Sequence, residues 1–470
     1  MARKNTDKVI FNHIKVLDAG AKGVSVAKAP DGKVIFIPNV VPGDVVDVQT
    51  FKKRKAYYEG KAVRFHELSE HRITPKCEYF GTCGGCKWQN MNYDQQLVFK
   101  QNEVRNHLQR IGKVSLPEFE PILGSEKQFF YRNKMEFSFS NARWLTEAEI
   151  DSVGELDNRN ALGFHIPRMW DKILDIHKCY LQEDPSNAIR NAVRQFANVN
   201  DLSFFNPRNH EGLLRTLMIR TTSTGEIMVL IQFFEDDQQK RELLMDHLAE
   251  RFPEITSLQY VVNNKPNDTI YDQQVHLYKG RDYILEEMEG LQFSINAKSF
   301  YQTNSDQAYE LYKITRDFAD LQGDEIVYDL YTGTGTIAQF ISKKAARVVG
   351  VESVPEAIIE ARINAERNNI TNCDFHVGDM KMIFNQEFIA QHGHPDVIIT
   401  DPPRDGMHKD VVEQILNIAP QKIVYVSCNS ATQARDLALM DEKYKVTRVR
   451  PVDMFPQTHH VENVVLLEKR

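Results

Sequence analysis

The order of apolar and polar positions divides the chain into three stretches. In the first, residues 9–67, short apolar runs follow tight-turn signals, Asp31-Gly32 before one run and Pro42-Gly43 before another. A turn dipeptide followed by an alternating run is typical of a β-hairpin. Several short strands with tight turns predict a small OB-like β-barrel, which we place at residues 1–68.

The second stretch mixes strands with helices. Apolar runs predict strands, and apolar residues at helical spacing predict helices. The predicted strands lie at 133–140, 214–234 and 269–280, and the predicted helices at 185–199 and 236–252. We therefore expect a central mixed α+β domain at residues 69–290, with a cysteine-rich segment near its start.

From residue 291 onward, apolar strands and helical patterns alternate. Each strand pattern is followed by a helical one, and this order is the signature of an open, mostly parallel α/β sheet. The strand patterns lie at 325–330, 346–352, 396–400 and 422–427. A last apolar run, 461–470, would close the sheet of a Rossmann-like α/β domain at residues 291–470.

Composition and charge limit the classes of protein to consider. Hydrophobic residues make up 42% of the 470 residues, no apolar run approaches the length of a membrane span, and the N-terminus lacks a secretory signal. We expect a cytoplasmic protein with no membrane partner. The net charge of −7 argues against a protein that binds nucleic acid over its whole surface. The basic run at 52–55 is either a solvated loop or a local contact with nucleic acid.

The first strand of the α/β stretch ends in a glycine-rich turn, with Gly333 and Gly335 between Tyr331 and Thr336. Glycines there let the backbone pass close to a ligand. Glu352 closes the next strand, where a carboxylate can accept both hydroxyls of a ribose. The turn lacks the third glycine of a dinucleotide site and the lysine of a P-loop. A tight structural turn is the alternative, but with Asp379 in a later "GDM" the pattern favours a nucleoside ligand, S-adenosylmethionine.

Two further residues follow strands that end at the same edge of the predicted sheet. Asp401 begins "DPPRDG", and Cys428 lies between an apolar strand and a predicted helix start. A cysteine in that place is either a small buried hydrophobe or a nucleophile whose thiol pKa the helix start lowers.

A cysteine beside a methyl donor suggests methylation of a carbon that is not nucleophilic by itself, such as C5 of uracil. Addition of the thiolate to C6 makes C5 an enolate carbon that attacks the methyl group. A base then removes the C5 proton, and elimination frees the cysteine. Glu462, at the start of the last strand, is our candidate for that base.

Five motifs in this order and spacing resemble the RNA uracil-5-methyltransferase family: "SFYQTN", "DLYTGTG", "DPPRDG", "VSCNSATQARDL" and "MFPQTHHVENVVLL". The resemblance implies that Cys428 is the nucleophile and Glu462 the proton-abstracting base. It also implies that a further set of residues lines the cofactor and target site: Gln302, Tyr331, Glu352 and Asp401, with Thr336 and Asp379 nearby. Ser430 stands where the family commonly has proline, and serine can cap the helix there.

Six cysteines, three of them in "CEYFGTCGGC", favour metal binding or catalysis over disulfides. Cys77, Cys83 and Cys86 need a fourth ligand, and Cys179 is the cysteine left over once Cys373 is assigned to the α/β domain and Cys428 to catalysis. The spacing alone leaves zinc and an iron–sulfur cluster open. The resemblance implies a 4Fe–4S cluster, as in the ribosomal RNA branch of the family.

The N-terminal barrel resembles a TRAM domain, an RNA-binding module that, like the cluster, the transfer RNA branch generally lacks. The whole chain therefore resembles the 23S ribosomal RNA uracil-5-methyltransferases, and we expect a monomer. The central segment would face RNA, and four of its side chains are candidates for stacking or phosphate contact, with structural packing an equal alternative for the aromatics: Tyr131, Arg132, Lys134 and Phe164.

Three other functions stay open from the sequence. The first is methylation of a uridine in the T loop of transfer RNA. The second is a non-catalytic RNA-binding iron–sulfur protein, which would have no need of Cys428 and Glu462 together. The third is an RNA cytosine C5 methylase, which usually places its cysteine in other motifs, such as a Pro-Cys pair that this chain lacks at Cys428.

Overall fold

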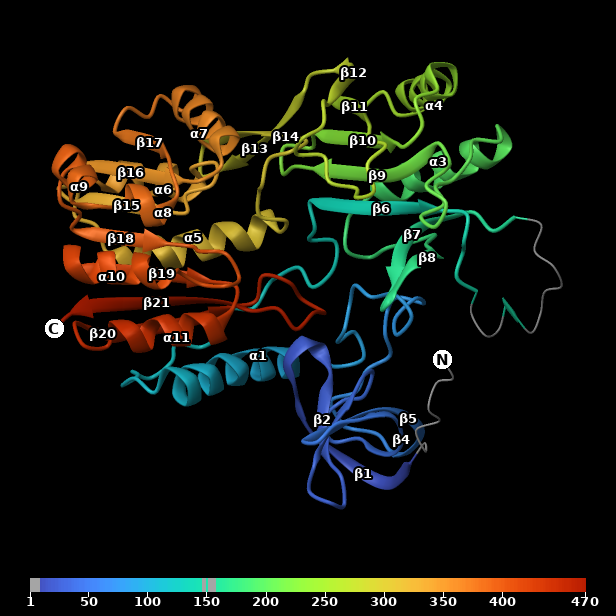
Figure 1. Ribbon diagram of the computed structural model, residues 1–470, viewed down its shortest axis with the longest axis horizontal. Coiled ribbons are helices and arrows are strands. Elements are labelled where there is room, and N and C mark those ends of the chain that lie inside the picture. The colour runs from blue at the N-terminus through green and yellow to red at the C-terminus, as the bar shows by residue number, and fades with distance from the viewer. Residues whose placement is uncertain (1–8, 146–148, 151–157) are drawn as a thin grey trace.

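The computed structural model describes residues 9–145, 149–150 and 158–470. Figure 1 shows a small barrel, a central sheet and an α/β layer structure arranged around a middle region where long loops meet. The barrel is closed and five-stranded, in the order β1-β2-β3-β5-β4. Its strands are β1 (Ile10–Ala19), β2 (Ser25–Lys28), β3 (Val34–Ile37), β4 (Val45–Lys53) and β5 (Tyr57–Glu67).

The barrel forms where the sequence predicts it because its strands alternate. Ile35, Val46 and Val48 point into the interior and are completely buried, while their neighbours along each strand face outward, as a period of two requires.

The central domain is built on a seven-stranded sheet in the order β12-β11-β10-β9-β6-β7-β8. The amphipathic helices α3 and α4 bury their apolar stripes on this sheet. The elements are β6 (Lys134–Ser140), β7 (Ala161–Ile166), β8 (Met169–Asp175), α3 (Ser186–Val199), β9 (Leu214–Thr221), β10 (Ile227–Phe233), α4 (Gln238–Arg251), β11 (Ser257–Val262) and β12 (His276–Gly280). The predicted strand at 269–280 is shorter than expected, because only from His276 onward does the segment pair with β11.

The α/β domain holds a second seven-stranded sheet, in the order β17-β16-β15-β18-β19-β21-β20. Its strands are β15 (Ile326–Leu330), β16 (Arg347–Glu352), β17 (Cys373–Val377), β18 (Val397–Thr400), β19 (Lys422–Ser427), β20 (Tyr444–Val452) and β21 (Glu462–Lys469). The helices are α5 (Ser305–Ala319), α6 (Thr336–Ile341), α7 (Pro355–Arg367), α8 (Met380–Ile383), α9 (Gln386–His392), α10 (Lys409–Ile418) and α11 (Ser430–Met440). A separate two-stranded sheet, β13 (Tyr283–Met288) with β14 (Leu291–Asn296), precedes them.

Apolar cores fill both faces of the α/β sheet, one shared with α5, α6 and α7 and the other with α10 and α11. Strands buried on both faces read as continuous apolar runs, which is why the sequence located them. The predicted fold class, a Rossmann-like α/β domain with an N-terminal barrel and a mixed central domain, is confirmed.

The chain reverses its direction of travel across the sheet at β15. This strand pairs in parallel with β16 on one side and β18 on the other. Open α/β sheets bind ligands at such a switch point, beyond the carboxyl ends of the strands.

The helix α1 (Tyr93–His107) departs from the predicted division at residue 69. In the sequence it belongs to the central stretch, but Val104 is completely buried in the α/β core with Leu437 of α11. Figure 1 shows α1 running beside α11, far from the central sheet. Among the described residues, no helix is long and apolar enough to cross a membrane.

Candidate active site

The carboxyl edge of the α/β sheet collects the candidate residues from five strands. Tyr331 follows β15, Glu352 ends β16, Asp401 follows β18, and Cys428 follows β19. β21 runs antiparallel, so its first residue, Glu462, lies at the same edge. The fold therefore brings together residues separated by up to 131 positions in the sequence.

The glycine turn after β15 is held by carboxylates from both sides. The Glu352 Oε2 atom accepts a hydrogen bond from the Gly333 amide at 3.2 Å. Beneath the turn, the Asp329 Oδ2 atom accepts from the Thr332 hydroxyl at 2.5 Å and from the Ala338 amide at 3.1 Å. Glu352 is thereby fixed beside the turn, where its other lone pairs could meet a ribose.

Gly335 is required by its conformation and by its surroundings. Its φ of +75° lies in the left-handed region, and a Cβ built there would come within 2.8 Å of the Phe375 ring. Glycine alone combines this backbone with such close packing. Thr336 follows as the first, buried residue of α6.

Cys428 and Glu462 are neighbours across two antiparallel strands. Ser427 of β19 pairs with Asn463 of β21. The next residue of β19 and the preceding residue of β21 therefore stand opposite one another. Cross-strand neighbours in an antiparallel pair have Cβ atoms roughly 5 Å apart, so the sheet register itself sets the candidate nucleophile beside the candidate base.

The expected lowering of the Cys428 pKa is wrong for the protein in this form. The helix start is present, because Asn429 caps α11 by accepting from the Ala431 amide at 3.1 Å. Burial is nevertheless the largest influence, and with the nearby carboxylates of Glu462 and Asp401 it raises the pKa of the Cys428 thiol to about 11. The sequence could not reveal this, since both carboxylates reach the cysteine through tertiary packing.

The two carboxyl groups also have perturbed acidity. Burial is the main cause of the raised pKa of each group. The Asp329 carboxylate raises the pKa of Asp401 further, and the Asp401 carboxylate raises that of Glu462. An edge rich in poorly neutralised carboxyl groups favours a cationic ligand.

Arg404 is a site residue that the sequence analysis missed. It lies within hydrogen-bonding reach of Cys428 and opposes the rise in the thiol pKa. Its backbone oxygen accepts from Asn429 Nδ2 at 2.9 Å, which joins the loop after β18 to the start of α11. The available signal was its position in "DPPRDG", three residues after Asp401.

The remaining predicted cofactor residues fall into two places. Tyr331 lies close enough to Asp379 and Glu352 for both carboxylates to affect its pKa. Burial first, and then the carboxylates of Asp436, Asp379 and Glu352, raise the pKa of Tyr331 to about 12. One Asp379 oxygen caps α8 by accepting from the Lys381 amide at 2.9 Å. Gln302 lies between β14 and α5, where its backbone oxygen accepts from Asn133 Nδ2 at 2.8 Å.

The four predicted metal ligands come together away from this edge. Cys77, Cys83, Cys86 and Cys179 line one cavity of about 350 Å³ beneath β7 and β8. Burial raises the pKa of Cys83 to about 11 and that of Cys86 to about 12, so a bound metal would have to supply the positive charge that keeps these thiols ionised.

The separation of the sulfur atoms bears on how these residues could hold a metal. Among the described residues, no three of the four cysteine sulfurs lie within 4.8 Å of one another. Zinc holds its sulfurs at about 2.3 Å and therefore places them less than about 4 Å apart. The thiols would have to move closer together to hold a single zinc ion, and the cavity between them leaves space for a larger group.

Of the four residues proposed to face RNA in the central segment, Tyr131 is buried and the other three are half-buried. Tyr131 is buried, and its hydroxyl donates to the Pro456 backbone oxygen at 2.9 Å. Phe164 packs against Phe137 and lines the cysteine cavity. Arg132 lies over the Phe455 ring, and Lys134 pairs with Glu136. Structural packing, the alternative left open for the aromatics, is what the fold shows.

Known proteins similar to this chain indicate its family. The sequence profile of a family described as tRNA (Uracil-5-)-methyltransferase matches residues 271–470. A Bacteroides thetaiotaomicron protein named as an uncharacterized RNA methyltransferase is 60% identical over 96% of this chain and its own full length. A similarly named Chlorobaculum tepidum protein is 37% identical over 97% of this chain and 96% of its own.

The solved structure of the Pyrococcus abyssi tRNA (uracil-54, C5)-methyltransferase with S-adenosyl-L-homocysteine is also similar, with a TM-score of 0.75 and 28% identity over 97% of this chain and 100% of that one. Fold and relatives together define an S-adenosylmethionine-dependent RNA methyltransferase. Within that class, the chain belongs to the RNA uracil-5-methyltransferase family.

Proposed function

We propose that this chain methylates C5 of a uridine in 23S ribosomal RNA, with Cys428 as the nucleophile and Glu462 as the base. The observation that carries the chemistry is the pairing of β19 with β21, which sets a thiol and a carboxyl group side by side. A covalent addition and a proton removal on adjacent carbons of one pyrimidine ring need two such groups close together.

The site suits a cationic methyl donor. When bound, S-adenosylmethionine would supply an electrophilic methyl group on a sulfonium centre. Its binding would fall to the residues at the carboxyl edge: Gln302, Tyr331, Thr336, Glu352, Asp379 and Asp401. Burial is the main cause of the raised pKa values of Asp401 and Glu462, and a sulfonium cation bound beside these carboxyl groups would favour their charged forms.

The chain's own residues would then carry the reaction on the uracil ring. The Cys428 sulfur forms a bond to C6, with Arg404 beside it to stabilise the thiolate. The methyl group is transferred to C5. Glu462 accepts the C5 proton, and the electrons of that bond expel the Cys428 thiolate from C6. The target uridine must leave its stack to reach this edge, which favours a loop as the substrate.

The choice of 23S RNA rests on the TRAM-like barrel and on the cysteine segment, for which we propose a 4Fe–4S cluster held by Cys77, Cys83, Cys86 and Cys179. We further propose that the barrel contributes to RNA binding and that the protein acts as a monomer. A specific observation favours the second candidate, transfer RNA. The Pyrococcus abyssi enzyme, which is named for a transfer RNA site, aligns over 97% of this chain. The segments that precede the α/β domain in this chain therefore do not exclude transfer RNA as the substrate.

Mass spectrometry of RNA from a strain lacking this gene tests the substrate. Loss of 5-methyluridine from 23S RNA alone supports the proposal. Loss from transfer RNA alone would assign the second candidate, and unchanged 5-methyluridine in both RNAs would overturn the activity in either form.

A matched pair of cysteine variants tests the nucleophile. We expect Cys428→Ala to bind S-adenosylmethionine as the wild type does but to transfer no methyl group to RNA. Cys373→Ala is the control, because Cys373 is a half-buried thiol of the same sheet that packs against the apolar core and donates to the Ala338 backbone oxygen at 3.7 Å. Near-normal transfer by Cys428→Ala would remove this cysteine from the mechanism.

A further inference from the structure

A group of three side chains on the barrel lies outside the site described above. Asp47 is the third residue of β4, and its pairing with each neighbouring strand is irregular nearby. The β1–β4 register shifts between Phe11 and Ile14, and the β4–β5 register shifts between Val45 and Val46. His13 and His66 are residues left over at these two β-bulges.

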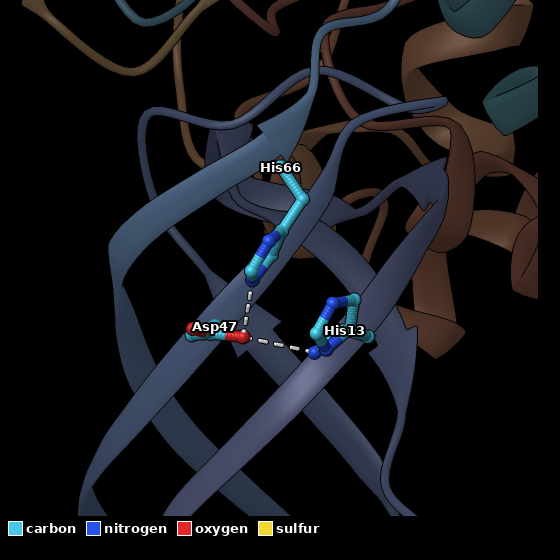
Figure 2. A group of neighbouring side chains, drawn as sticks. All are labelled: His13, Asp47 and His66. Atoms are coloured by element: carbon cyan, nitrogen blue, oxygen red, sulfur yellow. Dashed lines mark hydrogen bonds and ion pairs between the residues drawn. The ribbon is translucent and has the colours of Figure 1, made fainter.

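Both bulges direct an imidazole toward the same carboxylate (Figure 2). The His66 Nε2 atom lies 2.7 Å from Asp47 Oδ1, and the His13 backbone amide donates to the same oxygen at 2.9 Å. The two rings are stacked, with centroids 3.9 Å apart. One ligand atom from each of the three residues lies within 4.8 Å of the others.

The backbone of His13 adopts a conformation that few non-glycine residues accept. Its φ is +52°, in the left-handed region, which is uncommon and strained for a side chain with a Cβ. β-Bulges turn a side chain away from its regular direction and occur often near functional sites. Here, the strained bulge places the ring of His13 against that of His66.

Packing of the barrel does not account for this arrangement. All three side chains lie on the outside of the barrel, where His13 is exposed and the other two are half-buried. The hydrogen bond between His66 and Asp47 needs only one histidine, and at His13 it is the backbone amide that bonds to Asp47. Any residue could supply that amide, so the bond does not explain why an imidazole stands at position 13, stacked on that of His66.

We propose that His13, Asp47 and His66 bind a divalent metal ion of the zinc type on the outer face of the barrel. Two imidazole nitrogens and one carboxylate oxygen form a donor set that suits zinc, and a ligand from solvent would complete four-coordination. The ion takes the place of the proton that His66 and Asp47 share. Because zinc holds such ligands at about 2.0–2.2 Å, the group must contract slightly, and the exposed ring of His13 is the part free to move.

The expected consequence is a barrel whose strands β1, β4 and β5 are tied together at one point. Metal binding by a folded protein stabilises it by an amount that rises with the logarithm of the free metal concentration relative to the dissociation constant. This site is independent of the cysteine cavity and of the proposed catalytic reaction, because it shares no residue with either.

Zinc alone is the probe for the test, added to the full-length protein after its cysteine site has been loaded with iron. Bound zinc is measured by equilibrium dialysis and metal analysis. We expect one tightly bound zinc ion per chain in the wild type. In His66→Gln the zinc affinity should fall at least about 100-fold, because losing a metal ligand lowers the affinity at least as much as losing a residue that supports a ligand. Glutamine keeps a hydrogen-bond donor toward Asp47, so this variant should still fold.

His71→Gln is the matched control, because His71 lies just beyond the end of the barrel and outside the group. His13→Ala is a second test, since it removes a ligand and leaves the His66–Asp47 bond intact. Cobalt substitution supplies an independent readout: visible bands without strong thiolate charge-transfer absorption would identify nitrogen and oxygen ligands. Equal zinc binding by wild type, His66→Gln and His71→Gln, or a thiolate spectrum, would overturn the site.

Discussion

Cys428 and Glu462 illustrate how far the properties of single residues depend on their surroundings. Each is an ordinary side chain in the sequence, yet at the edge of the sheet burial raises the pKa of both. The Asp401 carboxylate adds to both shifts, and Glu462 adds to that of Cys428. In the ligand-free protein Cys428 therefore rests as a neutral thiol. A protected thiol at rest limits oxidation and unwanted addition, and we infer that the reactive form arises only when substrates change the local charge.

Replacing Glu462 with glutamine should trap a covalent adduct between protein and RNA. Glutamine keeps the shape of the side chain but cannot accept the C5 proton, so the thiolate cannot be expelled after methyl transfer. Denaturing gels with labelled methyl donor should show a slow band that contains both protein and label. Normal turnover without an adduct would assign the base elsewhere, with Asp401 the next residue to test, and Glu468→Gln, at the far end of β21, controls for changes in the strand.

Replacing Asp401 with asparagine should stabilise the ligand-free protein at higher pH. A carboxyl group whose pKa is raised by folding binds its proton more tightly in the folded state, so stability is lost as the pH rises from the unfolded pKa near 4 through the raised folded value. Asparagine carries no charge at any pH. We expect the difference in unfolding free energy between variant and wild type to grow by about 1–2 kcal/mol between pH 5 and pH 8.

Urea unfolding at several pH values measures this difference, and Asp410→Asn, an exposed aspartate at the start of α10, is the control. A difference that stays constant over the whole range would contradict the raised pKa of Asp401. We expect Asp401→Asn to transfer methyl groups more slowly while its stability rises, because functional residues are often destabilising in the folded protein.

Among the structural elements, α1 has a role that its position in the sequence hides. Through an ion pair and hydrogen bonds, it holds the loop 453–460, which leads to Glu462. Lys100 and Asp453 form an ion pair of 2.6 Å with both side chains completely buried, and the Tyr93 hydroxyl donates to Asp453 at 2.8 Å. The side chain of Gln96 accepts from the Gln457 amide at 3.0 Å. The position of the proposed base therefore depends on a helix that lies more than 350 residues earlier in the chain.

Replacing Lys100 with methionine should destabilise the protein by about 3–5 kcal/mol, because it leaves the buried Asp453 carboxylate without its cation. Methyl transfer should also fall by roughly tenfold or more, since the loop before Glu462 loses its anchor. Urea unfolding and single-turnover transfer measure the two effects. The double variant with Asp453→Asn should recover part of the stability, because it removes the unpaired charge.

Lys409→Met is the matched control on α10, where the lysine is exposed and pairs with Glu413 one turn away at 3.2 Å. Such a pair contributes less than about 1 kcal/mol. Equal losses in the Lys100 and Lys409 variants would show that the buried pair does not hold the loop.

At the C-terminal end of α1, the hydroxyl of Ser430 lies 2.8 Å from Nδ1 of His107. Ser430 is the position at which the chain departs from the proline common in the family. The expectation that this serine caps the helix is wrong, because Asn429 is the cap and Ser430 is the first residue of α11. Its hydroxyl instead links the helix after Cys428 to the end of α1, a contact that proline could not make.

In the whole molecule, the cysteine segment, α1 and the loop before Glu462 form one connected path. The Lys87 and Trp88 amides, which directly follow Cys86, donate to the Gln457 backbone oxygen at 2.8 and 3.1 Å. Gln457 lies five residues before Glu462. A metal group in the cysteine cavity would therefore stabilise a segment that contacts the active-site loop directly.

Replacing Cys83 with serine should abolish iron binding and weaken the contacts between the cysteine segment and the loop 453–460. Protein purified without oxygen should be brown and contain iron and sulfide, whereas the variant should be colourless and less stable, since metal binding is also folding energy. Hydrogen exchange at residues 453–460 should rise in the variant, and Cys373→Ser should change neither colour nor exchange. Stoichiometric zinc without iron in the wild type would contradict the cluster.

Several parts of this protein could be read directly from its residue order. The buried strands β15, β18 and β19 are continuous apolar runs, the glycine turn needs a particular backbone, and the barrel strands alternate with a period of two. Such patterns depend only on a few residues that are neighbours in the sequence, so they can be recognised without knowledge of the fold. The motif resemblance then pointed to the residues at the sheet edge.

Other features exist only because distant segments meet. The acidity of Cys428 depends on Glu462, which reaches it through the register of two strands. Arg404 became a site residue because the loop after β18 packs on α11, and α1 left its sequence neighbours to cover the α/β core. His13 and His66 converge on Asp47 through two bulges. Burial, pairing register and charge proximity are sums over contacts between remote residues, and no local pattern of side chains records them.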